Sequence, residues 1–176
     1  MRDAHPALSR VSFTVRTGDP EATESLGASL GEVLEAGDLV VLTGDLGAGK
    51  TTLARGLARG LGVAAPVKSP TFALRLDYPG RVPVHHLDLY RIERCAELDE
   101  LGLEDCFGAE GVALVEWGER LGAAAPPGAV RIVIEEDGDT GRIFTVAGPE
   151  PAVRRLAASA GVDPRRVAAL PPGEEP

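Results

Sequence analysis

The sequence predicts a single α/β domain in which a mixed, mostly parallel sheet is flanked by helices and includes a late antiparallel pair of strands. First, the short apolar runs at residues 39–42 and 112–115 are typical of parallel strands that helices cover on both faces. Second, residues 20–35 and 50–61 carry apolar side chains near helical spacing. Third, a length of 176 residues suits one domain with a sizeable core.

The first part of the chain predicts strands and helices in alternation. Polar and apolar residues alternate over residues 10–16, which predicts a strand with one exposed face. The helix expected next, over residues 20–35, is capped by Asp19 or Thr17 and ended by Gly37. The apolar strand at residues 39–42 then leads to the second helix, which is expected over residues 50–61.

The later part of the chain predicts strands separated by Pro and Gly turns. Strands are expected at residues 71–78, 82–90, 112–115, 130–136 and 142–146, and helices at residues 97–103, from residue 116, and at residues 151–160. The first two of these strands join through Pro79-Gly80, so we expect a hairpin. The last two should pair antiparallel and close the sheet or form its edge. We assign residues 1–160 to the domain and expect a disordered tail over residues 161–176.

A phosphate-binding loop follows the strand at residues 39–42. Its residues are Gly44, Asp45, Leu46, Gly47, Ala48, Gly49, Lys50 and Thr51. The glycines let backbone amides and the N-terminus of the next helix face phosphate groups. Lys50 adds a positive charge for the β- and γ-phosphates, and the Thr51 hydroxyl is placed to bind Mg²⁺. The fold class therefore narrows to a P-loop NTPase domain, which binds a nucleotide.

A P-loop also needs an acidic residue for the metal, usually at the end of a neighbouring apolar strand. Glu116 ends the apolar run at residues 112–115, whereas Asp88 ends the more polar run at residues 84–87. The pattern favours Glu116 and leaves Asp88 as the second candidate. The alternative for each is an ordinary solvated carboxylate.

Other residues near these motifs have two interpretations each. Trp117 either packs in the core or lies beside the nucleotide. His86 is either a donor to Asp88 or a polar residue on a half-exposed strand. Tyr90 and Arg91 are candidates for a contact to phosphate or to a partner, and for Arg91 the alternative is a plain surface position. A further segment is either a switch that senses the γ-phosphate or a rigid proline turn, and it consists of Ser69, Pro70, Thr71 and Phe72.

Composition restricts the partners. With a net charge of -9, the protein is a poor nucleic-acid binder, so in an RNA pathway we expect another protein to hold the RNA.

No apolar run approaches the ~18 residues of a membrane span, and the first ten residues do not resemble a secretory signal. We therefore expect a cytoplasmic protein. Cys95 and Cys106 are too few for a disulfide framework or a four-ligand zinc site.

Taken together, these motifs resemble the TsaE (YjeE) family, the small ATPase of bacterial tRNA threonylcarbamoyladenosine synthesis. The resemblance extends over most of the chain and ends at about Ala160. The residues that carry it are Gly44 to Leu53, Lys68-Ser69-Pro70-Thr71-Phe72, His86-Leu87-Asp88-Leu89-Tyr90-Arg91, Glu97-Leu98 with Leu101-Gly102, and Val115-Glu116-Trp117.

The resemblance implies that ATP and Mg²⁺ bind at Gly44 to Thr52. It further implies that Thr51 and Glu116 serve the magnesium site, that Asp88 acts near the metal or the attacking water, and that Trp117 lies close by. Lys50, Asp88 and Glu116 are then the expected catalytic residues. The partners implied are TsaB and TsaD, which transfer a threonylcarbamoyl group to adenosine 37 of tRNAs reading codons that begin with A. tRNA itself would be met only indirectly.

Three other functions are alternatives to the one that the resemblance implies. A small-molecule kinase would use the same loop, but it usually has an arginine-rich lid, and no arginine cluster lies in a plausible insertion. An ABC-type subunit would carry a signature motif that is absent from the sequence. A nucleotide-gated binding module stays open, because no arginine finger is evident and hydrolysis should be slow until a partner completes the site. The adenine pocket has only positional candidates, near Thr17 and Arg142.

Overall fold

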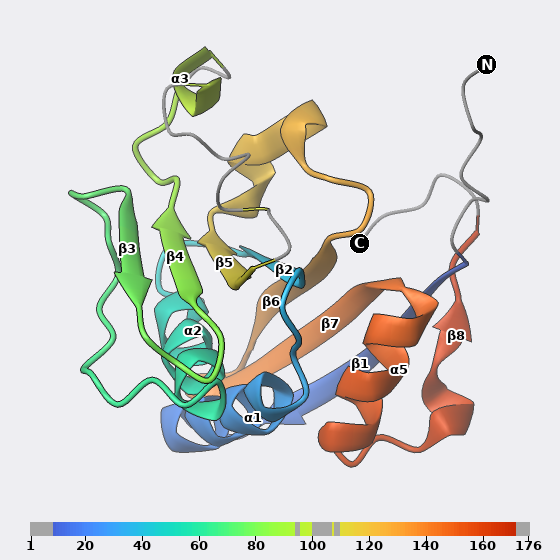
Figure 1. Cartoon of the computed structure of the whole chain (residues 1–176). Helices are drawn as coiled ribbons and strands as arrows, with labels where there is room; N and C mark the ends of the chain where they lie inside the picture. The colour runs from blue at the N-terminus through green and yellow to red at the C-terminus, as the bar shows by residue number, and fades with distance from the viewer. Residues whose placement is uncertain (1–8, 94–95, 100–106, 108–109, 172–176) are drawn as a thin grey trace, which may run out of the picture.

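One mixed sheet organises the protein. The computed structural model describes residues 9–93, 96–99, 107 and 110–171, and in that part of the chain eight strands lie in the order β3-β4-β5-β2-β6-β7-β1-β8 (Figure 1). The strands are β1 (Arg10–Thr17), β2 (Leu39–Thr43), β3 (Arg75–Tyr78), β4 (Val84–Asp88), β5 (Val112–Glu116), β6 (Val130–Asp137), β7 (Gly141–Pro149) and β8 (Ala168–Ala169). The helices are α1 (Pro20–Glu32), α2 (Lys50–Gly60), α3 (Ala96–Asp99) and α5 (Glu150–Ser159), with 3-10 segments η1 (Gly118–Ala124) and η2 (Pro164–Arg166).

The centre of the sheet is parallel and its flanks are antiparallel. β2 pairs in parallel with β5 and β6, and β5 also pairs in parallel with β4. β3 pairs antiparallel with β4, which confirms the expected hairpin, and β7 joins β6 to β1 by antiparallel pairing. The α/β class with a late antiparallel pair is confirmed. That pair lies inside the sheet and not at its edge, because β1 adds outside β7.

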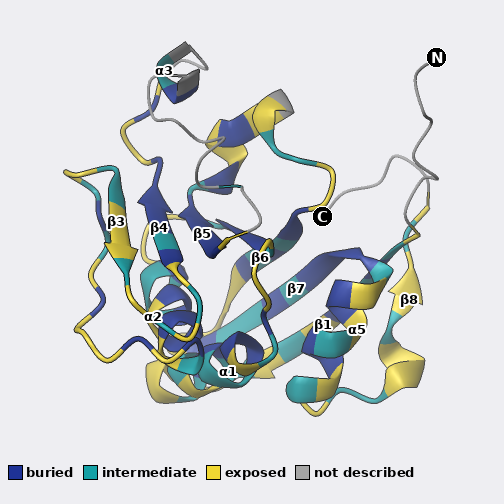
Figure 2. Cartoon of the chain, viewed as in Figure 1, coloured by how far each residue is buried: buried dark blue, intermediate teal, exposed yellow. Residues whose placement is uncertain are grey.

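Both faces of the central strands are buried, as the apolar run in β2 predicted. Val40 and Leu42 join a core with α1, α2 and α5, whereas Leu39 and Val41 face a second core that includes residues of β4, β5 and η1. Figure 2 shows β5, the parallel neighbour of β2, in the colour of buried residues. Alternate side chains of a strand point to opposite faces, so a strand that is apolar throughout needs cover on both sides. This arrangement fixes β2 and the loop that follows it.

Helices α1 and α2 lie side by side on one face of the sheet (Figure 1). Their contact is made through glycines, which bring the two backbones close together. A Cβ atom on Gly27 would lie 2.6 Å from the carbonyl oxygen of Leu53, and one on Gly56 would lie 2.2 Å from that of Glu24. Such distances leave no room for a side chain. The helix that carries Lys50 and Thr51 is therefore held against α1 at backbone contact.

The ends of α1 are set by polar groups. The Asp19 carboxylate accepts a hydrogen bond from the amide of Ala22 at 2.7 Å, so Asp19 is the N-cap. Thr17, the other candidate, has its hydroxyl 2.7 Å from that of Thr23 instead. The helix ends at Glu32, earlier than the predicted residue 35. There the Arg81 guanidinium donates to the carbonyls of Gly31, Glu32 and Leu34 at 2.5–3.0 Å, and so supplies donors to carbonyl groups at the end of the helix.

Several predicted elements differ in extent from those in the structure. The strand expected from residue 71 starts at Arg75, because residues 71–74 form a turn in which the Leu74 amide donates to Pro70 and Leu74 has a positive φ of 63°. The segment after β5 is a 3-10 segment that starts at Gly118, with Glu116 still in the strand. The helix expected at residues 97–103 is described as α3 up to Asp99, and its remainder lies outside the described residues.

The predicted disordered tail is wrong for residues 161–171. This segment forms η2 and then β8, which pairs with Val11 and Ser12 of β1. The Leu170 amide also donates to the Arg10 carbonyl at 2.9 Å. Backbone hydrogen bonds to an open sheet edge order a segment whatever its side chains are, so composition did not reveal the pairing. Residues 172–176 lie outside the description.

Within the described part of the chain, no helix is long and apolar enough to cross a bilayer.

The glycine contact between α1 and α2 predicts the effect of Gly56→Ala. Helix propensity alone would favour alanine by about 1 kcal/mol. The new Cβ atom, however, would meet a backbone carbonyl at 2.2 Å, which only a shift of a whole helix relieves. We expect the free energy of unfolding to fall by about 1–3 kcal/mol, as for other overpacked sites.

Urea unfolding followed by circular dichroism measures this difference. Gly128→Ala is the matched control, because a Cβ atom there meets nothing within 4 Å, and it should change stability by at most about 0.5 kcal/mol. A Gly56→Ala protein as stable as the wild type would show that the helices are not in backbone contact.

Candidate functional site

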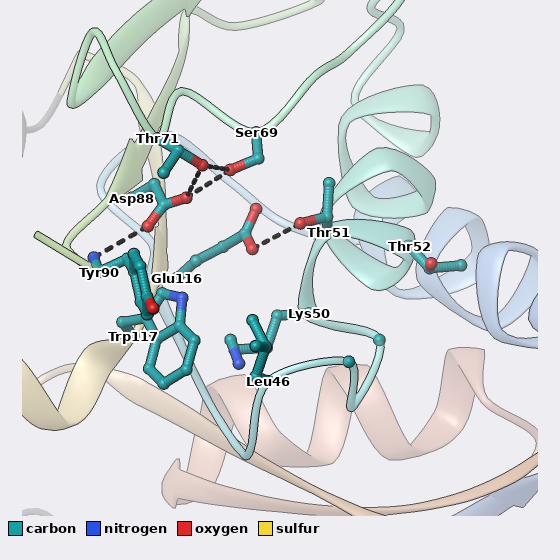
Figure 3. A pocket seen from close by; sticks show the side chains of 12 residues that line it. Leu46, Lys50, Thr51, Thr52, Ser69, Thr71, Asp88, Tyr90, Glu116 and Trp117 are labelled. Atoms are coloured by element: carbon teal, nitrogen blue, oxygen red, sulfur yellow. Dashed lines mark hydrogen bonds between the residues drawn. The ribbon is translucent and has the colours of Figure 1, made fainter.

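A cavity of about 390 Å³ opens where β2, β4 and β5 end and α2 begins (Figure 3). Its walls come from the phosphate loop, the turn before β3, and the ends of β4 and β5. The lining residues are Leu46, Gly47, Gly49, Lys50, Thr51, Thr52, Ser69, Thr71, Asp88, Tyr90, Glu116 and Trp117. Ligands of open α/β sheets bind at this position, outside the carboxyl ends of parallel strands.

The phosphate loop has the backbone that the glycine pattern predicted. Gly47 and Gly49 have φ values of 85° and 106°, a region that disfavours residues with a side chain. Gly49 is the N-cap of α2 and no side chain caps this end. The first amides of the helix are therefore available to an anion, which the helix dipole also attracts.

Lys50 is held inside the loop and is only 5% exposed. Its ammonium donates to the carbonyl oxygens of Gly44 at 2.6 Å and Asp45 at 2.9 Å, and it lies 3.6 Å from the centre of the Trp117 ring. Burial lowers the pKa of Lys50 below its usual value, although the nearby carboxylates, Glu119 foremost, oppose that shift. A phosphate group would offer this buried cation a stronger partner than carbonyl oxygens do.

Glu116 and Thr51 meet at the floor of the cavity. The Thr51 hydroxyl donates to Oε2 of Glu116 at 2.7 Å, and Oε1 of the same carboxylate lies 2.8 Å from Nε2 of His86 (Figure 3 draws the first of these bonds). Glu116 is 2% exposed and His86 is 1% exposed. A buried carboxylate needs such donors, because desolvation otherwise penalises its charge. Both interpretations of His86, a donor to Asp88 or a polar residue on a half-exposed strand, are therefore wrong, because the ring is buried and contacts Glu116.

Asp88 holds the turn that precedes β3. Its Oδ2 accepts hydrogen bonds from the hydroxyls of Ser69 and of Thr71, the latter at 2.7 Å, and its Oδ1 accepts from the Tyr90 amide at 2.9 Å. Figure 3 shows Ser69 and Thr71 pointing at this carboxylate. The segment suggested as a switch is thus tied to a carboxylate in the cavity by two hydroxyl groups.

Strand register explains why the two carboxylates are neighbours. In the parallel pairing of β4 with β5, Asp88 lies opposite Glu116 and His86 lies opposite Leu114. Residues two apart on a strand share a face, so His86 and Asp88 point to the same side, as do Leu114 and Glu116. Leu114 belongs to the core shared with α2, which means that all three polar side chains lie on the face of the sheet that α2 covers.

Trp117 forms a wall of the cavity in an unusual backbone conformation. Its φ of 59° and ψ of 45° are left-handed, which is rare for a bulky residue and marks a constrained position. A Cβ atom on the next residue, Gly118, would lie 1.9 Å from Val41, so the chain passes close over β2 here. The Tyr90 ring lies 4.9 Å from the Trp117 ring. Trp117 therefore lines the cavity, and it also packs against the second core.

Five residues of the phosphate loop and of the segment 69–72 do not line the cavity: Gly44, Asp45, Ala48, Pro70 and Phe72. Gly44 and Asp45 contribute carbonyl oxygens to Lys50, and Ala48 is buried. The Phe72 side chain is 85% exposed and stacks on Arg91, whose guanidinium lies 4.2 Å from the ring centre. Tyr90, which was considered only as a contact to phosphate or a partner, belongs to the lining.

A smaller cavity of about 160 Å³ lies on the other side of the loop. It shares Gly47, Gly49 and Thr52 with the first cavity and is completed by Pro20, Thr23, Asp139, Thr140 and Arg142. The Arg142 guanidinium donates from Nε to the Ala48 carbonyl at 2.8 Å, which ties β7 to the loop. Of the two positional candidates for an adenine pocket, Arg142 lines this cavity and Thr17 does not.

The oxygen atoms at the cavity floor suit a hard cation such as Mg²⁺. A hydroxyl from Thr51 and carboxylates from Glu116 and Asp88 are its preferred ligand types. In the described residues, no group of three or more His, Cys, Asp and Glu is arranged to hold a metal alone. This fits a metal that keeps waters and takes further ligands from substrate phosphates.

Comparisons with known proteins agree on one family. A family model described as "Threonylcarbamoyl adenosine biosynthesis protein TsaE" matches residues 17–144. The tRNA threonylcarbamoyladenosine biosynthesis protein TsaE of Bacillus subtilis (strain 168) is 41% identical over 136 residues, which cover 76% of this chain and 85% of that protein. The protein of the same name from Treponema pallidum (strain Nichols) is 40% identical over 125 residues, with coverages of 71% and 93%. The crystal structure of Bacillus subtilis YdiB matches with a TM-score of 0.73 and 33% identity, over 85% of this chain and 94% of that one.

The contact between Lys50 and Trp117 predicts a fluorescence signal. A phosphate ligand should draw the ammonium off the ring of Trp117, the only tryptophan in the sequence, and so change its emission. In Lys50→Met the change should be lost at ligand concentrations that saturate the wild type. Hydrogen bonds to charged groups contribute about 1.5–3 kcal/mol, so affinity should fall about 10- to 100-fold.

Titration of both proteins with ADP measures the effect. Lys68→Met is the control, because Lys68 is an exposed lysine that does not line the cavity, and it should respond as the wild type does. An equal emission change at equal ADP concentration in the wild type and in Lys50→Met would show that Lys50 does not bind the phosphates.

Proposed function

Because the chain belongs to the TsaE family, we propose that it is a magnesium-dependent ATPase of tRNA threonylcarbamoyladenosine biosynthesis. The proteins it resembles carry that pathway in their names. The observation that supports the ATPase assignment most directly is the 2.7 Å contact between Thr51 and Glu116. It unites the hydroxyl of the phosphate loop with an acidic strand end, the two protein groups that hold Mg²⁺ in P-loop NTPases.

Binding of ATP is assigned to the loop and the start of α2. Backbone amides of residues 44–52 surround the phosphates, and Lys50 leaves its carbonyl partners to contact the β- and γ-phosphates. Thr51 and Glu116 hold Mg²⁺, which would neutralise charge on the β- and γ-phosphate oxygens. The base and ribose are assigned to the smaller cavity beside Thr52 and Arg142.

Asp88 is assigned to the attacking water. Its carboxylate lies at the end of the strand next to Glu116 and carries the hydroxyls of Ser69 and Thr71. It can accept a hydrogen bond from a water molecule placed in line with the γ-phosphate and so orient it. The water oxygen bonds to the γ-phosphorus as the bond to the β-phosphate oxygen breaks, and the products are ADP and phosphate.

A partner is expected to complete the site. Among the described residues, no arginine lines the first cavity, although a cation at the γ-phosphate contributes greatly to hydrolysis in this class of enzymes. Large apolar side chains also stand exposed near it, since Leu46 is 78%, Phe72 is 85% and Tyr90 is 43% exposed. Exposed apolar groups beside a site suit a protein interface. We assign TsaB and TsaD as the partners, with tRNA bound by them and not by this acidic chain.

The test is ATP turnover in a reconstituted system with TsaB, TsaD and tRNA. The protein alone should bind ATP and ADP with Mg²⁺ and hydrolyse ATP slowly. An arginine supplied by a partner contributes about 10³–10⁵ in kcat, so the partners should stimulate turnover at least about 10-fold. Lys50→Ala and Glu116→Ala should abolish both turnover and formation of the modified adenosine.

Glu135→Ala is the control, since Glu135 is an exposed carboxylate on β6 outside both cavities. It should retain turnover, stimulation and tRNA modification. ATP turnover that TsaB and TsaD do not stimulate would contradict the role of a partner. Modified tRNA made with Lys50→Ala would contradict the ATPase function. Stoichiometric phosphorylation of a nucleoside or sugar would favour a small-molecule kinase instead.

A further inference from the structure

One buried polar side chain contacts the proposed metal site without lining the cavity. His86 lies on β4, one residue beyond His85 and two before Asp88. Its ring is 1% exposed, and a neutral or charged imidazole buried to this extent needs a partner. Val84 lies two residues earlier on the same face of β4 and packs in the core as an apolar residue. Core packing alone therefore does not require a histidine at position 86.

We propose that His86 is a positioning residue, which orients the Glu116 carboxylate so that one oxygen stays free for Mg²⁺. This inference rests on the proposed function, because it concerns the same magnesium site. His86 itself would touch neither metal nor nucleotide.

The contacts of Glu116 support this division of labour between its two oxygens. Oε1 lies 2.8 Å from Nε2 of His86, deep in the protein, whereas Oε2 accepts from the Thr51 hydroxyl at the cavity floor. An ionised carboxylate only accepts hydrogen bonds, so Nε2 must carry the hydrogen. A metal ion held through Oε2 would leave the contact of His86 with Oε1 in place.

Strand pairing makes the contact rigid. His86 and Glu116 lie on adjacent parallel strands that hydrogen-bond along their length, in a register that places Asp88 opposite Glu116. Both residues are at least 98% buried, so neither side chain has space for alternative rotamers in solvent. Partners of this kind, which hold a ligand by its second polar atom, typically change metal affinity by about 10- to 100-fold.

The other ring nitrogen of His86 separates this role from general core packing. Nδ1 is buried and has no hydrogen-bond partner among the described residues. A histidine kept only to satisfy buried polar groups would use both nitrogens. The polar contact of the ring is thus made at Nε2, and its partner there is Glu116, the proposed metal ligand.

The chain offers a matched control in the preceding residue. His85 lies on the opposite face of β4, where Nδ1 contacts the Asp77 carboxylate at 2.8 Å, away from the cavity. The same substitution at His85 and at His86 therefore removes the same atoms from the same strand. Only the substitution at His86 removes the contact with Glu116.

The experiment measures ADP binding by calorimetry, first in EDTA and then over a series of Mg²⁺ concentrations. His86→Leu and His86→Asn should bind ADP in EDTA within about twofold of the wild type but need about 10-fold more Mg²⁺ for the same gain in affinity. His86→Gln should restore the wild-type requirement, because its amide nitrogen reaches the place of Nε2, which the shorter asparagine does not. His85→Leu and His85→Gln should both behave as the wild type.

Thermal unfolding checks that each variant is folded. If His86→Leu is not folded, the comparison of His86→Gln with His86→Asn tests the proposal. An unchanged Mg²⁺ requirement in His86→Asn, or equal loss in His86→Gln and His86→Asn, would overturn the positioning role. If ADP binding by the wild type does not depend on Mg²⁺ at all, the proposed function fails and not this inference alone.

Discussion

The parallel register of β2, β5 and β4 is the constraint on which the site depends. It brings three strand ends to one edge of the sheet, with Leu42 opposite Glu116 and Glu116 opposite Asp88. The loop after β2 then lies beside both carboxylates. β2 and β5 are buried on both faces, so a slip in register would disturb the packing of apolar side chains on each face. The pairing is therefore strongly specified. The chemistry thus rests on core packing.

Within that frame, every charged group of the site already has a partner. Lys50 is held by loop carbonyls and the Trp117 ring, Glu116 by Thr51 and His86, and Asp88 by hydroxyls of the turn before β3. Buried charges without partners would be costly. In the proposed function, a nucleotide with its metal would replace the carbonyl contacts of Lys50, while the bond between His86 and Glu116 would persist.

The sequence predicted the parts of this site that depend on local pattern. The phosphate loop, the strand before it and the two acidic strand ends are readable because loop backbone and buried strands impose strict residue types, as at Gly49 and Val41. Sequence patterns did not predict the contacts between segments that lie far apart in the chain. Arg81 ends α1 from 47 or more residues away, β8 pairs with β1 from the far end of the chain, and His86 contacts Glu116 and not Asp88. The last of these needs the register of β4 against β5, which no single segment encodes.

The central claim is that Thr51 and Glu116 hold the metal of a bound nucleotide while Asp88 faces the γ-phosphate. A crystal structure with Mg²⁺ and a non-hydrolysable ATP analogue tests it most directly. The account predicts Mg²⁺ on the Thr51 hydroxyl with Glu116 in its coordination shell, and Lys50 moved from the Gly44 carbonyl to the phosphates. Mg²⁺ bound by Asp88, with the bond between Thr51 and Glu116 intact, would contradict it.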